Sequence, residues 1–539
     1  MEKQDKIIFK SRQNSALDGD EKQIRQAVIP QMEMALDSTP MLLSAIVGID
    51  TPVRPMQLEE IEALGDPFTT QILLKGKTPM TLTELINEIE ALDAPSYPIR
   101  KLFLIAEGGQ IKLNQPEFSL NARLVYTWQK DNSTPPDLML STVPVANHNE
   151  SLLQLISWSE KDGSFHFFER KRGFWGWAGN SFTAFDERAR GKGPFDSHIN
   201  GGLVMKELKF PWAHWHSMSN SIPRDAFDAD SEFNTNPLFG IISSADKLEP
   251  IVKTGIRRWY KSRIKNDLNG TTLDNVETYT RQLFGSTTVN LISSGIEFHR
   301  IKNDSIALPG TFFYDLDGIE YAASKIDPFQ AVIPPINIAF DGNMYDAIAR
   351  EMQLRIVDNC SSGTPIKEGD THFCFTVPER AFEDLEACKQ LVQNKFISAK
   401  FMLCTLMVDF TNPIRSELRK ALMAYAPDNI NINSDFALEN AILSEIQKTE
   451  FQNRPEVIAF MEYWNESNLL IRVQNELKLF MESIQNQMQN EAYAKKLFQL
   501  AEFRKQRFRT RLLNEFCSTT SRTEHPVDKR TIDKNGIIN

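Results

Sequence analysis

Tryptophan and histidine are concentrated in one segment of this chain, from Trp158 to His216. The segment holds five of the eight tryptophans (Trp158, Trp175, Trp177, Trp212 and Trp215) and four of the eight histidines (His166, His198, His214 and His216). Histidine is the commonest metal ligand and a usual acid–base group, and tryptophan rings form apolar pocket walls. This segment is therefore the first candidate for a functional site.

The two histidines of the sequence HWH predict a metal site if they lie on a strand. Side chains alternate along a strand, so His214 and His216 then share a face and can bind one ion. On a helix the same two side chains diverge by about 200°, and chelation by both fails. His198, in a glycine-flanked loop, completes the predicted set, with Glu207 or Asp196 as an oxygen ligand.

The chemistry that follows from this set is metal-assisted oxidation. Two histidines and a carboxylate with open positions form the non-haem iron arrangement, and three histidines also suit copper or zinc. We therefore predict a metal-dependent oxidoreductase acting on a small organic substrate, with iron or copper bound by His198, His214 and His216. Glu207 is the predicted fourth ligand or acid–base group. The rings predicted to shape the substrate cavity are Trp175, Trp177, Trp212 and Trp215. The alternative is that these rings are core side chains with hydrogen-bonded N–H groups.

A glycine-rich loop, ARGKGPFDSHINGG, lies within the same segment. Its glycines allow positive φ angles and close approach of the backbone to a ligand; they are Gly191, Gly193, Gly201 and Gly202. Lys192 is the predicted residue for binding an anionic group of the substrate there. The spacing matches neither the P-loop nor the dinucleotide-binding pattern, so a purely structural glycine loop is the alternative.

Other catalytic signatures are absent from the sequence. The HWH spacing resembles that of cupin metal sites, but Met218, Ser219 and Asn220 stand where such a site needs a carboxylate. The sequence GNSFT lacks the last glycine of a hydrolase nucleophile elbow, and neither a kinase signature nor HExxH is present. These reaction classes are therefore disfavoured.

A basic segment near the C-terminus indicates a different function. The sequence FRKQRFRTRLL places five cations close together, Arg504, Lys505, Arg507, Arg509 and Arg511. Such a helix can bind a partner, or its cations can complement the helix dipole on a solvated face. The alternative to an enzyme is therefore a non-catalytic scaffold or effector that binds a protein partner through residues 503–511.

Composition limits the partners and the location. The 539 residues include 71 acidic and 60 basic side chains, a net charge of −11 that argues against nucleic-acid binding by the whole surface. The five cysteines form no CxxC pair, and no apolar run is long enough for a signal peptide or a transmembrane helix. We therefore expect a cytoplasmic protein with a small-molecule substrate.

The elements that must position these residues predict an α+β fold. It has a helical N-terminal part, a central antiparallel strand-rich region and a helical C-terminal part. The predicted regions are a flexible N-terminus (1–26), a helical region (27–99), a central region with the candidate site (100–330), a mostly helical region (331–517) and a loose polar tail (518–539).

Local signals define several of these elements. LLQLISWS and SFHFFER flank the turn EKDG and predict a hairpin, to which GFWGWAG adds a third strand. Thr81 or Thr83 is predicted to cap a helix in TLTELINEIEAL. Residues 247–268 are predicted to be helical. Apolar residues at three- and four-residue spacing predict two helices or one long bent helix over 467–516.

Overall fold

The computed structural model divides the chain into two compact units. It describes residues 42–92, 97–107, 121–143, 152–171, 173–204, 229–244, 247–293, 305–334, 338–357, 366–367, 376–509, 520–522 and 528–539. Unit 1 comprises the described residues up to Arg263, and unit 2 comprises those from Ile264 onward. The division falls inside helix α6 (Glu249–Asn266). No helix in the described ranges is both long and apolar enough to cross a membrane.

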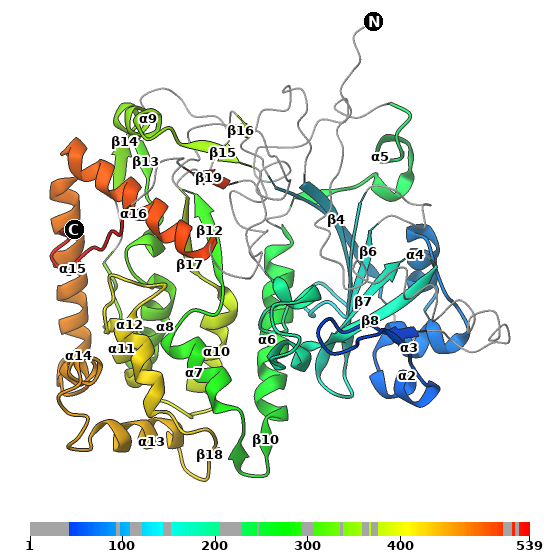
Figure 1. The fold of residues 1–539 in the computed structure, drawn as a ribbon, viewed down its shortest axis with the longest axis horizontal. Coiled ribbons are helices and arrows are strands. Elements are labelled where there is room, and N and C mark those ends of the chain that lie inside the picture. The colour runs from blue at the N-terminus through cyan, green and yellow to red at the C-terminus, as the bar shows by residue number, and fades with distance from the viewer. Residues whose placement is uncertain are drawn as a thin grey trace, which may run out of the picture. The chain divides into compact units, whose positions relative to one another are not determined.

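Unit 1 is built on a nine-stranded sheet in the order β2-β1-β8-β7-β6-β5-β4-β3-β9 (Figure 1). The strands are β1 (Leu42–Ser44), β2 (Arg54–Pro55), β3 (Ile99–Glu107), β4 (Asn121–Gln129), β5 (Leu138–Thr142), β6 (Leu153–Ser159), β7 (Ser164–Lys171), β8 (Phe174–Asn180) and β9 (Ser243–Ser244). Neighbouring strands from β3 to β8 pair antiparallel, whereas β1 pairs parallel with β8, and β9 pairs parallel with β3.

The hairpin predicted around EKDG is confirmed as β6 and β7, and β8 is the predicted third strand. Strands β1 and β2, by contrast, lie in the region predicted to be helical. The prediction is wrong there because β1 is stabilised by a distant partner: Leu42 lies opposite Trp175 in the sheet. Local periodicity carries no information about such a pairing.

Helices cover one face of this sheet, which we call the α3 face and which carries Leu155 and Phe168. They are α2 (Leu58–Leu64), α3 (Pro67–Gln71) and α4 (Leu82–Glu90), with a 3₁₀ turn at Leu73–Lys75 (Figure 1). Phe68 of α3 is fully buried, and its ring lies 5.0 Å from that of Phe168. Thr81 caps α4 as predicted, in a capping box with Glu84.

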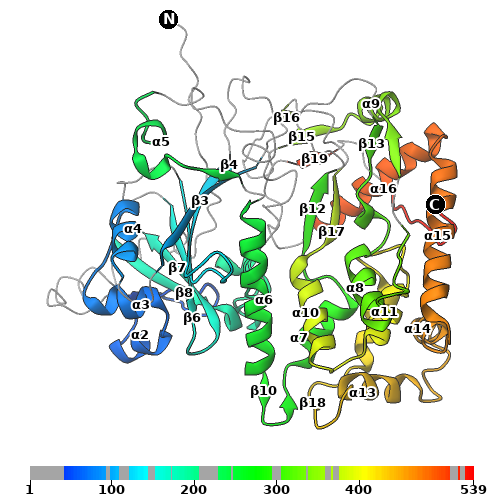
Figure 2. The same cartoon turned by 180° about the vertical axis from the view of Figure 1, so that it is seen from behind.

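The opposite face, which we call the α6 face, carries Ile156, Trp158 and Phe167 and is covered by α6 and by the chain that follows β8. That chain forms 3₁₀ turns at Ser181–Phe185 and Gly193–Asp196. The guanidinium of Arg258 on α6 stacks 4.2 Å above the ring of Trp158. Figures 1 and 2 show α6 on the side of the sheet opposite α2, α3 and α4. The remaining elements of unit 1 are α5 (Glu232–Thr235) and a 3₁₀ turn at Pro237–Phe239.

Unit 2 is mostly helical, as predicted for the C-terminal part. Its helices are α7 (Val276–Phe284), α8 (Leu316–Ile326), α9 (Gly342–Glu351), α10 (Phe382–Gln393), α11 (Ala399–Met407), α12 (Glu417–Ala421), α13 (Ala437–Ile446), α14 (Pro455–Trp464), α15 (Leu469–Gln487) and α16 (Glu491–Arg509), with 3₁₀ turns at Gly310–Phe312 and Leu422–Tyr425. Figure 2 shows α7, α8, α10 and α11 packed together, and one apolar cluster joins their buried side chains. In the described part of the segment 467–516, residues 467–509, the chain forms two helices, α15 and α16.

Short strands complete unit 2. They form four small sheets: β10 (Leu268–Asn269), β11 (Thr272–Leu273) and β18 (Ile430–Asn431); β12 (Val289–Ser293) and β17 (Thr376–Arg380); β13 (Ser305–Ala307) and β14 (Ala339–Asp341); and β16 (Ile366–Lys367), β15 (Arg355–Val357) and β19 (Thr520–Arg522). Together with the large sheet of unit 1, these elements confirm the predicted α+β fold with a strand-rich centre.

The C-terminal residues are packed rather than loose. Ile532 and Ile538 are 3% and 2% exposed and form a β-bridge with each other. The hydroxyl of Tyr493 on α16 donates to the carbonyl of Gly536 at 2.6 Å. The prediction of a loose tail is therefore wrong for these residues, because two isoleucines among polar neighbours are enough to anchor the segment to the core.

Candidate functional site

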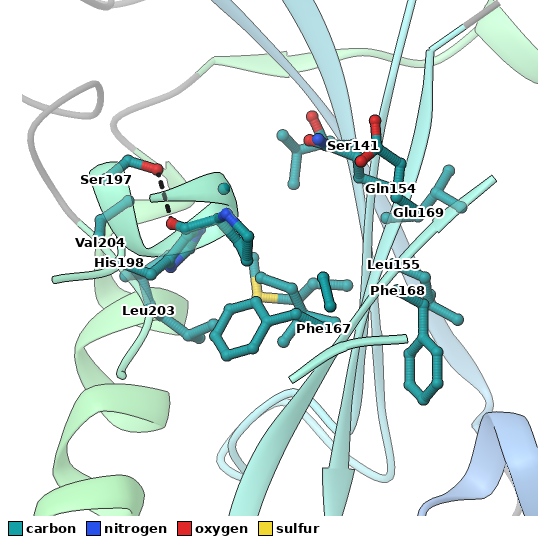
Figure 3. Close-up of a pocket in the computed structure, with 18 of the residues that line it drawn as sticks. Ser141, Gln154, Leu155, Phe167, Phe168, Glu169, Ser197, His198, Leu203 and Val204 are labelled. Carbon is teal, nitrogen blue, oxygen red and sulfur yellow. Dashed lines mark hydrogen bonds between the residues drawn. The ribbon is translucent and has the colours of Figure 1, made fainter. Parts of the chain in front are cut away.

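A cavity of about 150 Å³ lies within unit 1, between the α6 face of the sheet and the loop 193–204 (Figure 3). Strands β4 to β7 form one wall, and Leu248 and Val252 at the beginning of α6 close one side. The lining residues therefore come from a sheet, from the beginning of a helix and from the loop. We take this cavity as the candidate site of unit 1.

An apolar row of side chains crosses the sheet wall. Met139 pairs with Ile156, and Ile156 pairs with Phe167, so the three residues are direct neighbours on adjacent antiparallel strands. Cross-strand neighbours point to the same face. The ring of Phe167 also contacts Phe195 of the loop, edge to face, at 5.3 Å between centroids. The apolar row thus forms one end of the cavity.

A polar row runs beside it, two residues away from the apolar row on each strand. Ser141 pairs with Gln154, and Gln154 pairs with Glu169. Because side chains alternate with a period of two, these residues share the face of the apolar row. Figure 3 shows the three polar side chains close together and away from the ring of Phe167. The hydroxyl oxygen of Ser141 is buried and has no hydrogen-bond partner among the described residues.

The glycine loop forms the opposite wall. Gly191, Gly193 and Gly201 have positive φ angles of 71°, 56° and 71°, as predicted from the sequence, whereas Gly202, which was grouped with them, does not have a positive φ. At Gly201 a Cβ atom would lie 2.1 Å from the carbonyl oxygen of Ser181, so only glycine fits there. These glycines let the loop turn back over the sheet and place Asp196 and His198 in the cavity wall.

His198 is held by its own loop. Its Nδ1 lies 2.8 Å from the carbonyl oxygen of Gly202, which can only accept, so Nδ1 carries a proton. In the neutral ring Nε2 then has the free lone pair of the imidazole. This tautomer can bind a metal ion or accept a proton through Nε2. The ring also packs against Phe167, at 5.1 Å between centroids. His198 is therefore oriented as a cavity-wall residue.

Two carboxylates line the cavity, and they face it from different elements. Glu169 on β7 is 7% exposed, and Asp196 belongs to the loop. The lining residues that the structure describes include no lysine and no arginine. In the described ranges no group of three histidine, cysteine or acidic residues is arranged to hold a metal ion. Glu169, Asp196 and His198 therefore do not form a metal site by themselves.

No family model matches the chain, and neither a curated protein nor a solved structure matches it. The function of the cavity is therefore argued from its geometry and chemistry.

The structure places two of the predicted substrate-binding tryptophans away from this cavity. Trp175 is fully buried on the α3 face, where its ring lies 4.8 Å from that of Phe68 and its Nε1 donates to the carbonyl of Pro79 at 2.8 Å. Trp177 lies on the same face and donates to Nδ1 of His166 at 3.0 Å. Both rings are on the side of the sheet opposite His198, because strand alternation directs them toward the N-terminal helices.

The other predicted site residues divide into two groups. Lys192 is exposed and does not line the cavity, although its neighbours Gly193 and Pro194 do. The rest, Glu207, Trp212, His214, Trp215 and His216, lie outside the described residues. The three-histidine metal site and the role of Glu207 therefore stay predictions.

Sequence reasoning missed the sheet wall of the cavity. The hairpin prediction gave the correct strands, but it did not single out Ser141, Gln154 or Glu169. In SFHFFER apolar residues occupy both faces of the strand, so the pattern does not separate a core face from a cavity face. These residues could have been recognised as polar residues that lie opposite one another on adjacent strands. That pattern is visible only when the register of the strands is known.

The basic segment on α16 is partly internal. Arg504 is 8% exposed and its guanidinium donates to the carbonyls of Phe312 and Thr411, the latter at 2.8 Å. Lys505 is 3% exposed and pairs with Glu502. The prediction of a solvated basic face is therefore wrong for these two residues, because buried carbonyl and carboxylate groups accept their hydrogen bonds.

Proposed function

We propose that unit 1 binds a small organic molecule, about the size of a single ring, in the cavity between its sheet and the glycine loop. The observation that supports this proposal is the cavity itself, with a volume of about 150 Å³ and walls made of both apolar and polar side chains. An engineered apolar cavity of ~150 Å³ in another protein binds benzene, so the volume suits a molecule of that size.

The composition of the walls supports an organic ligand over water alone. Met139, Ile156 and Phe167 form an apolar surface. Contact with a ligand ring removes this surface from water, which favours binding. Ser141 and Gln154 offer hydrogen-bonding groups at the other end. A largely apolar pocket with a few placed polar groups is the usual form of a small-molecule site.

The experiment is a binding screen with a cavity-filling variant. Single-ring compounds of different charge are titrated into the full-length protein and followed by ligand-observed NMR. Ile156→Phe adds a ring inside the cavity, and we expect it to weaken the binding of any hit at least about ten-fold, a loss of ~1.4 kcal/mol. Ile241→Phe is the matched control, because Ile241 is 89% exposed and lies outside the cavity.

Saturable binding by the wild type and by the control, with the loss confined to Ile156→Phe, supports the proposal. The proposal fails if no compound binds at millimolar concentration, or if Ile156→Phe binds as the wild type does. Circular dichroism of each variant checks that the fold is retained.

Metal-dependent oxidation in the same cavity is the second proposal, because His198, one of the predicted ligands, lines it. The test is metal analysis of protein expressed with added iron, copper and zinc. Stoichiometric metal in the wild type that is lost in His198→Ala and in His214→Ala supports this chemistry. A wild-type protein without stoichiometric metal after that expression overturns it.

A further inference from the structure

Four of the polar residues in the cavity wall already interact within the protein. The hydroxyl of Ser197 and Nδ1 of His198 each donate to a backbone carbonyl, at 3.3 and 2.8 Å. Glu169 and Asp196 also have interactions with other groups of the chain. Because both carboxylates of the described wall are engaged in this way, a charged ligand would have to share its partner with the protein, and burying an incompletely paired charge is costly.

Ser141 and Gln154 are the polar residues of the described wall whose side chains make no hydrogen bond to another described residue. They lie opposite each other on β5 and β6, and Figure 3 shows both side chains at the polar end of the cavity. The hydroxyl oxygen of Ser141 is buried, and a buried polar atom without a partner is unfavourable. A ligand that pairs with this hydroxyl removes that cost and gains affinity from it.

The two side chains are complementary to a hydroxyl group. The Ser141 hydroxyl and the Gln154 amide can each donate and accept hydrogen bonds. A serine hydroxyl also has three staggered positions, so it can turn toward an occupant of the cavity. The Cβ atoms of cross-strand neighbours lie about 4.5–5.5 Å apart, so one ligand hydroxyl can reach both residues, accepting from one and donating to the other. An alkyl group at the same place would leave both side chains unpaired.

The apolar row accommodates the rest of such a ligand. The ring of Phe167 contacts the rings of Phe195 and His198 and lines the cavity beside Ile156. A ligand ring that packs on this surface removes apolar area from water, which favours binding. The cavity volume of about 150 Å³ suits one such ring.

We infer that the ligand of this cavity is an uncharged ring compound with a hydroxyl group, in which the hydroxyl is hydrogen-bonded to Ser141 and Gln154 and the ring packs on Ile156 and Phe167. The inference rests on the proposed binding function and specifies the chemistry of its ligand. Binding involves no covalent step, so the affinity is the quantity to measure.

The test compares four single-ring compounds that differ in one substituent. Benzyl alcohol, ethylbenzene, benzylamine and benzoate are titrated into the full-length protein at neutral pH by isothermal titration calorimetry. We expect benzyl alcohol to bind at least about ten-fold more tightly than benzylamine and benzoate, because each of these would bury a charge that the wall does not fully pair. Ethylbenzene is the reference for shape, since it fills the cavity without a hydrogen bond.

Ser141→Ala separates the hydrogen bond from the shape. We expect the affinity for benzyl alcohol to fall at least about five-fold relative to that for ethylbenzene, and the hydration of the two ligands cancels in this ratio. The variant is expected to fold, because it removes a hydroxyl without a hydrogen bond to the described residues. Gln154→Leu applies the same test at the second residue. Ser133→Ala is the control, because Ser133 is exposed between β4 and β5 and does not line the cavity.

The outcomes distinguish the two proposals. If none of the four compounds binds to the wild type, the proposed binding function fails and the inference falls with it. If ethylbenzene binds, but neither Ser141→Ala nor Gln154→Leu changes the ratio of the two affinities, the cavity binds small molecules and the hydroxyl inference is wrong. Tighter binding of benzylamine or benzoate than of benzyl alcohol would overturn the choice of an uncharged ligand.

Discussion

Asp162, His166 and Trp177 form a hydrogen-bonded chain on the α3 face. Nε1 of Trp177 donates to Nδ1 of His166, so the imidazole proton is on Nε2, which lies 2.9 Å from the Asp162 carboxylate. His166 is 1% exposed. This histidine and this tryptophan, both conspicuous in the sequence, therefore connect the turn of the β6–β7 hairpin to β8 and serve the fold.

The stability contribution of Asp162 is expected to depend on pH. Burial raises the pKa of its carboxyl, but the hydrogen bond from His166, with the nearby serine hydroxyls, outweighs burial, so the pKa lies below its usual value. Because the folded pKa is below the unfolded value of about 4, the contribution is present above pH ~4 and is lost as the pH falls through the folded pKa. We expect Asp162→Asn to be less stable than the wild type at neutral pH, with a difference that shrinks below pH ~4.

Urea unfolding followed by tryptophan fluorescence at several pH values measures this difference. Asp230→Asn is the control, because Asp230 is exposed, and its unfolding free energy at neutral pH is expected to stay within about 0.5 kcal/mol of the wild type. A difference for Asp162→Asn that stays constant down to about pH 3 contradicts the prediction.

Gly201 is expected to be indispensable for the glycine loop. An alanine there is strained in two ways: its φ of 71° is unfavourable, and its Cβ would overlap the carbonyl oxygen of Ser181. Gly76 has a similar φ of 75°, but a Cβ added there would meet no atom of the described residues within 4 Å. We expect Gly76→Ala to cost about 1–2 kcal/mol of unfolding free energy and Gly201→Ala to cost clearly more. Urea unfolding measures both losses. Equal losses of unfolding free energy for Gly76→Ala and Gly201→Ala would contradict the tight contact between Gly201 and Ser181.

Helix α16 shows how an element can bury charge as well as apolar surface. Leu497 and Phe498 pack in the core of unit 2, at 0% and 1% exposure. The next turns place Arg504 and Lys505 in the interior as well, where carbonyl and carboxylate groups accept their hydrogen bonds. The guanidinium of Arg504 also stacks 4.7 Å above the ring of Phe312. This part of the helix therefore holds unit 2 together.

Loss of the Arg504 side chain is expected to destabilise unit 2. Arg504→Ala leaves the carbonyls of Phe312 and Thr411 buried without this donor, which costs about 2–4 kcal/mol of unfolding free energy. Lys478→Ala is the control, because Lys478 on α15 is 64% exposed and its pair with Glu482 is long, at 3.8 Å. Thermal unfolding compares the two. Equal midpoints for Arg504→Ala and Lys478→Ala would contradict the structural role of Arg504.

At the scale of the whole molecule, the chain consists of two units with different cores. Unit 1 buries side chains on both faces of a large antiparallel sheet, whereas the core of unit 2 is dominated by helices. The division after Arg263 falls inside α6, so no linker rich in proline, glycine or serine marks it. The candidate cavity is lined by residues of unit 1.

Ligand binding is therefore expected to protect unit 1 selectively. With a saturating single-ring ligand, hydrogen exchange of amides in β5, β6, β7 and the loop 193–204 should slow, because a ligand that binds only the folded state lowers the population of open states. The α3 and α15 amides serve as references within the same sample. Protection of α15 equal to that of β6 would show that the ligand binds elsewhere or that the units open together.

Elements with local signals could be predicted from the sequence. EKDG between two apolar-rich runs predicted the β6–β7 hairpin, Thr81 was one of two predicted caps for α4, and apolar spacing predicted two helices or one bent helix where α15 and α16 lie. Such signals depend on residues within one or two turns of the chain. The positive φ of the loop glycines was also predictable, because glycine alone tolerates it without strain.

Which of these residues contact one another depends on the packing of the elements. Alternation places Trp175 and Trp177 on one face of their strand, but only packing against α3 shows that this face is opposite the one beside His198. In the same way, register across three strands brings Ser141, Gln154 and Glu169 together. Contacts between residues far apart in sequence depend on how whole elements pack, which composition and periodicity do not encode.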